Sequence, residues 1–507
     1  MTATLSVSAI VLVCVLTVAA GGFGLRWSRT TSDFYVASRA VPPSWNASAI
    51  GGEYLSAASF LGVAGLVYLA GLDTLWYPVG YTLGFVMVLI FVAAPLRRSG
   101  AYTLSDFAEA RLGSPVLRGL CTALVIVTGW LYLLPQLQGA GLAIHALTGA
   151  PHWTGGLIVT VVVTANVLAG GMRSLTLVQA AHFWVKLFAI AIPAVILVWV
   201  WNRNGQPIPD GVSLVERPLD ATQSSAMTLY AAYSTLLALC LGTMGLPHVV
   251  VRFYTNPDGR SARRSTVVVI GLLGLFYLFP PMYAALGRAY LPTLPPGMAA
   301  DTLVLLLPNL ITPGALGDTL TAILAAGAFA AFLSTASGVA MAVAGVLDQD
   351  VVRPALGLTQ GANGIGSFRI ATVAATTIPC LLLLGVSGAG LATTVALVFA
   401  LTASTFCPLL ILGVWWRRLT PAGAIAGMSA GAVAALVATV ATVAGVTGTG
   451  WIHILLAQPG AWTVPLAFGL TVIVSLLTPR QIPKNALQTL VRLHTPESLQ
   501  LSTPPRA

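Results

Sequence analysis

A single acidic residue lies in the middle of an apolar stretch that is long enough to cross a bilayer. Glu53 and three serines stand inside the run WNASAIGGEYLSAASFLGVAG, from Trp45 to Gly65. A carboxylate at membrane depth is costly unless it faces protein, water or an ion, so it indicates a functional site with a charged partner. The pair Gly51-Gly52 directly before it lowers helix propensity by about 1 kcal/mol per residue and predicts a break in the helix there. The alternative is a kinked helix whose small residues admit a close neighbour.

A broken membrane helix could bind ions and carboxylates, because it leaves backbone carbonyls and N–H groups unpaired in mid-bilayer. A second interruption occurs in LCLGTMGLPHVV, where Gly242, Gly245 and Pro247 fall inside another apolar span. Interrupted spans at matching places in two halves of a chain are typical of the binding sites of transporters. The two interruptions therefore predict one central site.

The elements that position these residues are membrane helices. The chain has 507 residues, of which 57% are hydrophobic and 7% charged, with a mean hydropathy of +0.89. This composition excludes a soluble protein and predicts an all-α polytopic membrane protein. Apolar runs of membrane length predict about thirteen transmembrane helices. They lie near residues 5–24, 44–71, 75–96, 116–147, 153–170, 174–201, 226–250, 264–290, 319–347, 368–388, 391–416, 420–446 and 461–478.

Most of the 24 lysines and arginines fall in alternate loops and in the C-terminal tail. The positive-inside rule then predicts a multi-pass protein of the cell membrane, with the N-terminus outside and the C-terminus in the cytoplasm. These basic residues are scattered and are not interleaved with aromatics, so the net charge of +10 does not indicate a nucleic-acid partner. The five cysteines lie inside apolar spans without paired spacing, which is not the pattern of a disulfide or zinc framework.

Six segments in order resemble the solute:sodium symporter family, in the branch that takes up acetate and other short monocarboxylates. The first is DFYVASR at 33–39 followed by GGEYLSAASFLGVAG at 51–65. The others are AYTLSDFAEARLG at 101–113, YLLPQLQGAGLAI at 132–144, GGMRSLTLVQAAHFWVK at 170–186, GLPHVVVRFYT at 245–255 and FAAFLSTASGVAMAVAGVLDQDV at 329–351. The resemblance covers most of the chain up to about residue 420.

This resemblance implies a LeuT-type fold of two inverted repeats of five helices, with one extra helix before them. The extra helix and a cytoplasmic loop would occupy residues 1–43, and the first repeat residues 44–202. An outer loop and the second repeat would follow at 203–416, additional transmembrane helices at 417–480, and a cytoplasmic tail at 481–507.

The resemblance also implies a cation site. Na⁺ is a hard cation that is bound by several oxygens, which this fold supplies from backbone carbonyls and hydroxyls. The family pattern places Ser334 and Thr335 at the ion, together with the backbone oxygens of Gly52, Leu55 and Ala331. The alternative is that both hydroxyls bond back to carbonyls four residues earlier in their own helix. No enzymatic cofactor is expected, and H⁺ remains an alternative coupling ion because the relatives tend to carry Asp in place of Glu53.

A carboxylate of two to four carbons needs a few hydrogen-bond donors and a small apolar wall. No arginine is obviously buried to pair with it, and Lys186 is expected to extend to the cytoplasmic face from within its span. The candidates for substrate binding or coupling are Glu53, Tyr54, Ser56, Ser59, Gln136, Gln138 and Thr243.

The sequence therefore predicts a symporter, not an enzyme, that imports acetate, propionate or pyruvate with Na⁺ or H⁺ by alternating access. A symporter for another small solute such as proline is an alternative, as is a non-catalytic membrane subunit or sensor. The expected partners are the small substrate and the lipid bilayer. The preferred acid, the stoichiometry, the oligomeric state and any accessory membrane subunit stay open.

Overall fold

The computed structural model describes residues 2–24, 41–209, 225–358, 365–385, 390–445 and 450–500. The motif at 33–39 and the tail after residue 500 lie outside these ranges. The described part of the chain is helical and contains no strand, which confirms the predicted all-α fold.

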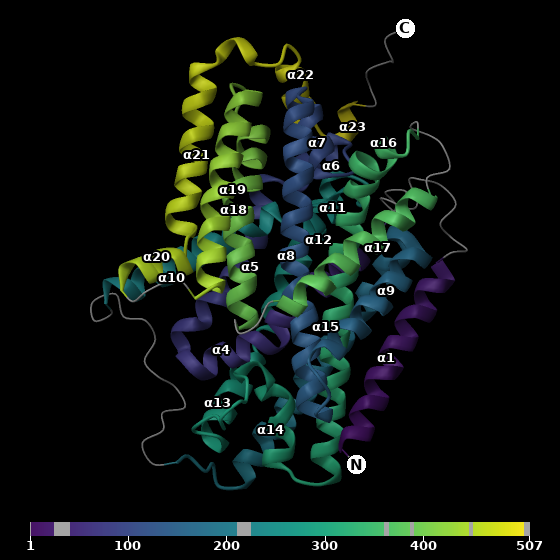
Figure 1. The fold of residues 1–507 in the computed structure, drawn as a ribbon, viewed down its shortest axis with the longest axis vertical. Coiled ribbons are helices and arrows are strands. Elements are labelled where there is room, and N and C mark those ends of the chain that lie inside the picture. The colour runs from purple at the N-terminus through teal and green to yellow at the C-terminus, as the bar shows by residue number, and fades with distance from the viewer. Residues whose placement is uncertain are drawn as a thin grey trace.

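Long helices form the body of the molecule (Figure 1). They are α1 (Thr2–Gly24), α5 (Trp76–Phe91), α8 (Pro115–Thr148), α9 (Trp153–Arg203), α10 (Ala226–Gly245), α12 (Gly259–Phe276), α13 (Pro280–Tyr290), α15 (Ala315–Leu347), α17 (Ile365–Leu382), α18 (Leu391–Trp415), α19 (Pro421–Val443) and α21 (Gly460–Leu477).

Shorter elements complete the breaks and the ends of the bundle. They are α3 (Pro43–Tyr54), the π-helical turn η2 (Ala58–Gly62), α4 (Val63–Ala70), η3 (Leu72–Leu75), α6 (Ala93–Ser99), α7 (Leu104–Leu112), α11 (Pro247–Tyr254), η4 (Ala300–Thr302), α14 (Leu303–Ile311), η5 (Asp348–Val352), α16 (Arg353–Ala355), η6 (Leu383–Gly385), α20 (Trp451–Ala457), η7 (Pro479–Gln481), α22 (Ala486–His494) and α23 (Glu497–Gln500).

Within the described ranges, 11 helices are long and apolar enough to cross a membrane, or 12 if one bent pair is a single span. The predicted count of about thirteen agrees once α9, which runs for 51 residues, is divided at Gly171. Gly171 has φ 58° and ψ −170°, a backbone conformation that belongs to neither helix and favours glycine. The two spans predicted at 153–170 and 174–201 therefore meet at this kink.

The first break lies at Leu55–Ala57. There α3 ends, and the chain bends by 69° into η2 and α4. The break was expected at Gly51-Gly52, but both glycines are helical residues of α3. A Cβ atom on Gly52 would lie 2.0 Å from the carbonyl oxygen of Gln179 in α9. The glycine at position 52 thus allows close packing of α3 against α9, and the helix opens one turn later.

The second break lies where it was predicted. Helix α10 ends at Gly245, Leu246 is extended with φ −70° and ψ 115°, and α11 begins with Pro247. Proline has no N–H for the helix ladder and disfavours the helical conformation of the residue before it. This local chemistry explains why α10 stops at Gly245.

Helix α15 forms the centre of the bundle, since its most apolar membrane-length window is entirely buried. It packs against α9, α8 and α1, whereas α1 itself lies at the edge of the bundle and is mostly exposed (Figure 1). Helices α6, α7, α16, α22 and α23 gather at the end where the described chain finishes, and the N-terminal end of α1 lies at the other (Figure 1). Arg97, Arg98, Arg111, Arg353 and Arg492 belong to the first of these ends.

Candidate functional site

The C-terminal end of α3 presents backbone oxygens to the centre of the bundle. The last carbonyls of a helix have no partner within it and must find one elsewhere. Here two of them accept from side chains of α15: Ser334 Oγ donates to Gly52 O at 2.6 Å, and Thr335 Oγ1 donates to Glu53 O at 2.6 Å. The two hydroxyls thus reach across to the break instead of back along their own helix.

Lys186 of α9 reaches the same oxygens. Its Nζ donates to the carbonyl oxygen of Gly52 and, at 2.8 Å, to that of Leu55. The side chain is fully buried, so the expectation that it extends to the cytoplasmic face is wrong. We call the set of Gly52 O, Glu53 O, Leu55 O, Ser334 Oγ and Thr335 Oγ1 the carbonyl cage.

The carbonyl cage brings together four of the five residues predicted to bind a cation. Gly52 is bonded to Ser334 directly and to Leu55 through Lys186, and Thr335 is bonded to the neighbouring carbonyl of Glu53. The fifth, Ala331, is buried on α15 one turn before Thr335. Gln179 of α9 fixes this part of α15, because its side-chain amide donates to Ser334 O at 2.9 Å. The binding role of these residues stays a prediction.

Glu53 is paired with an arginine that sequence reasoning placed in a loop. Arg252 lies in α11, and its Nε donates to Glu53 Oε2 at 2.6 Å, with both side chains 1% exposed. Arg252 Nη1 also donates to Thr176 Oγ1 of α9 at 2.8 Å. The pair joins the first broken helix to the second. The expected charged partner of Glu53 is therefore Arg252.

The candidate substrate residues surround the first break. Tyr54 OH lies 2.9 Å from Thr243 Oγ1 of α10 and donates to Tyr81 O, and Ser59 Oγ lies 2.8 Å from Tyr277 OH. Gln136 Oε1 accepts from the backbone N–H of Ala57 at 2.9 Å, so one of the N–H groups expected to face a carboxylate already has a partner. All of these side chains are buried.

Two further candidates differ in their surroundings. Ser56 is buried in the break itself and is hydrogen-bonded to Tyr132 of α8. Gln138 is only half-buried, because a helix turns about 100° per residue and places it on a different side of α8 from Gln136.

Aromatic side chains that sequence reasoning missed form one wall beside the break. Tyr81 and Tyr277 stack with their ring centroids 5.9 Å apart, and Phe399 packs against Tyr81 at 5.2 Å. The ring of His248 is buried and its centroid lies 4.9 Å from that of Tyr132. The available signal was the position of tyrosines inside apolar spans, where a hydroxyl usually has a polar partner.

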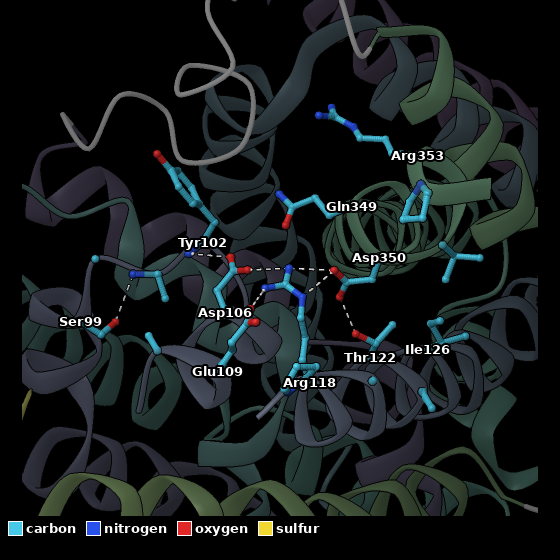
Figure 2. A pocket seen from close by; sticks show the side chains of 18 of the residues that line it. Ser99, Tyr102, Asp106, Glu109, Arg118, Thr122, Ile126, Gln349, Asp350 and Arg353 are labelled. Atoms are coloured by element: carbon cyan, nitrogen blue, oxygen red, sulfur yellow. Dashed lines mark hydrogen bonds and ion pairs between the residues drawn. The ribbon is translucent and has the colours of Figure 1, made fainter. Parts of the chain in front are cut away.

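A polar pocket of about 1250 Å³ opens near α7, the start of α8 and η5 (Figure 2). Arg118 lies at its centre and binds three carboxylates: Asp106 at 2.9 Å, Glu109 at 2.5 Å and Asp350 at 2.7 Å. Thr122 also contacts Asp350. This network ties the α7–α8 corner to the chain that leaves the central helix α15.

The sequence matches the model described as "Sodium:solute symporter family" over residues 34–431. It is 33% identical to the uncharacterized symporter YwcA of Bacillus subtilis, over 88% of this chain and 89% of that relative. It is 30% identical to a protein of Corynebacterium glutamicum named monocarboxylic acid transporter, over 88% of this chain and 86% of the relative.

Two solved structures share the fold. A Na⁺-coupled sialic acid symporter in a substrate-bound outward-open state superimposes with a TM-score of 0.69 at 12% identity, covering 93% of this chain and 98% of that one. Mhp1, a nucleobase-cation-symport-1 family transporter in a closed conformation, gives a TM-score of 0.53 at 13% identity, covering 92% and 99%.

Proposed function

The chain belongs to the sodium:solute symporter family, and from this premise we propose that it imports short-chain monocarboxylates with a coupling cation by alternating access. It is thus a membrane transporter and not an enzyme. Na⁺ is the coupling ion that the family implies, and H⁺ is the second candidate. Acetate, propionate and pyruvate are the proposed substrates.

One observation carries the substrate class. The relative named monocarboxylic acid transporter aligns over most of both chains at 30% identity. Hydroxyls and aromatic rings lie around the first break, and this combination of hydrogen-bonding groups and an apolar wall is what a small carboxylate needs. A symporter for another small solute such as proline remains the alternative within the family.

The two broken helices provide the basis for alternating access. Glu53–Arg252 and Tyr54–Thr243 each join α3 to the second broken helix, at α11 and α10 respectively. In transporters of this architecture one group of helices rocks against the other around a central site. We infer that the lengths of these two contacts change when the groups of helices move relative to each other during the transport cycle.

The test is uptake of labelled acetate into proteoliposomes that contain the purified protein. Unlabelled propionate and pyruvate should each suppress the signal, whereas glucose and proline should not, because the site selects a small carboxylate. Protein-free liposomes measure leakage of the neutral acid, and collapse of the ion gradients with an ionophore should abolish accumulation.

Suppression by proline but not by propionate would assign the protein to an amino-acid branch. Acetate uptake no faster than into protein-free liposomes would favour a role as a non-catalytic subunit or sensor.

A further inference from the structure

We propose that the Lys186 ammonium is the resident cation of the carbonyl cage, in the place where the family implies a sodium ion, so that the cage of the native protein does not bind Na⁺. The inference rests on the proposed symport function only in taking the family's Na⁺ as the expected occupant. It concerns this cage alone and not sodium bound elsewhere on the chain.

The carbonyl oxygens of the cage already accept hydrogen bonds from side chains of this chain. A backbone carbonyl has two lone pairs to offer. Gly52 O accepts one hydrogen bond from Lys186 Nζ and one from Ser334 Oγ, so both are in use. Leu55 O accepts from Lys186 as well, and Glu53 O from Thr335 Oγ1. A sodium ion could not coordinate Gly52 O without displacing one of these donors.

The charges around the carbonyl cage also disfavour a sodium ion. Lys186 is completely buried, and among the described residues the acidic group that interacts with it electrostatically is Glu53. That carboxylate is already shared with Arg252, so the cluster holds two cations for one anion. A further unit charge about 4 Å from the ammonium would bind roughly a thousandfold more weakly, at the effective dielectric of a protein interior.

Among the described residues, the other side chains near Lys186 carry no negative charge that would balance a second cation. His182 lies one turn earlier on α9, and its Nε2 lies 3.0 Å from Thr17 Oγ1 of α1. Helix α15 contributes the uncharged Ser334 and Thr335. The described part of these neighbouring helices therefore brings no second carboxylate that would balance a sodium ion beside the lysine. The cage fits one monovalent cation, and the chain itself supplies it.

The experiment measures the melting temperature of the purified full-length protein in NaCl, KCl and choline chloride at equal ionic strength. The native protein should melt at the same temperature in all three salts. Lys186→Ala should melt lower in choline chloride and KCl and should recover in NaCl, because truncation frees the carbonyl oxygens for the ion. Adding Ser334→Ala to this variant should remove the recovery, which places the ion in the cage.

Lys484→Ala is the matched control. Lys484 is exposed near the C-terminal end of the bundle, so its removal should leave the salt response unchanged. Lys186→Ser also truncates the side chain, should show the same recovery in NaCl, and serves where the alanine variant does not fold.

Stabilisation of the native protein by NaCl that disappears in Ser334→Ala would overturn the proposal, because sodium would then enter the cage in spite of Lys186. A folded Lys186→Ala variant without any sodium response would overturn it too. Neither result depends on which solute is transported, so failure of the uptake experiment would be a separate outcome.

Discussion

At the scale of residues, the molecule contains an ion pair that is almost completely removed from water. Glu53 and Arg252 are each 1% exposed, and among the described residues Oε1 of Glu53 and Nη2 of Arg252 have no hydrogen-bond partner. Attraction between two buried charges offsets the cost of their desolvation only while both are present. Lys186 adds a second positive charge to the same cluster. The charge balance of the site therefore depends on the carboxylate of Glu53.

The first prediction at this scale is a double-mutant cycle. Glu53→Gln should destabilise the protein by about 3–5 kcal/mol, because it leaves the guanidinium of Arg252 buried without an anion. Arg252→Met should have a comparable effect by leaving the carboxylate unpaired. The double variant should be more stable than the sum of the two single effects implies, since it removes both charges together. Thermal unfolding of the purified variants measures this, and strictly additive losses would show that the pair does not act as a unit.

Sequence reasoning identified Glu53 as a functional acid but could not identify its partners. Arg252 and Lys186 lie 199 and 131 residues from the groups that they contact. Hydropathy reports how deep a residue lies and not which helix lies beside it, so both cations were assigned to loops or to the membrane face. Ser334 and Thr335 were found because a family pattern marks them. Lys186, which shares Gly52 O with Ser334, ends the resembling segment at 170–186, but no role at the ion was assigned to it.

At the scale of elements, the contact between α3 and α9 is controlled by one missing methyl group. The Cα of Gly52 faces Gln179 O so closely that a Cβ atom would lie 2.0 Å from it. A heavy atom cannot be accommodated at that distance, so any larger residue must push the two helices apart. Because Lys186 and Gln179 both extend from α9, such a shift would also move the donors that hold the carbonyl cage.

We predict that Gly52→Ala destabilises the protein by about 1–3 kcal/mol, the usual cost of overpacking, and lowers uptake more than the loss of folded protein explains. Gly119→Ala is the control, since it lies in α8 and a Cβ atom there meets nothing within 4 Å. That change should be neutral or stabilising by up to about 1 kcal/mol, through helix propensity. Melting temperatures and uptake per folded molecule distinguish the two. Equal behaviour of the two variants would contradict the packing explanation.

The position of a helix break was predictable from the sequence where a local residue such as proline determines it. It was less predictable where packing between helices determines it. The break at Leu246 follows from Pro247 and was predicted. The break after Tyr54 was placed three residues early, because Gly51-Gly52 was interpreted as a point of opening and serves helix contact instead. The short helix α14 was missed, since its 9 residues are too few for a span.

At the scale of the whole molecule, several arginines gather at one end of the bundle. The elements that gather near the end of the described chain include α6, α7, α16 and α22, each with an arginine in its last turn (Figure 1). An excess of arginine and lysine marks the cytoplasmic side of membrane proteins. By this rule the predicted topology places this end and the C-terminus in the cytoplasm and the N-terminus outside.

The corresponding prediction uses reporter fusions in intact cells. A fluorescent protein fused after residue 500 should be fluorescent, and a phosphatase that is active only outside the cytoplasm should be inactive there. The same phosphatase fused after Asn204, in the predicted outer loop, should be active and serves as the internal control. The reverse pattern at both positions would invert the orientation and would exchange the roles of the two ends.

The link between the two broken helices also bears on how the protein unfolds. Chains built from repeats can lose one repeat while the other stays folded, when few contacts cross between them. With the predicted repeat boundaries, Glu53 of α3 lies in the first repeat and Arg252 of α11 in the second, and separating them would leave an unpaired charge on each repeat inside an apolar medium. A half-unfolded state is therefore strongly disfavoured. The ion pair therefore makes the two predicted repeats unfold together as one cooperative unit. The helix breaks permit motion within the bundle but do not let one repeat unfold alone.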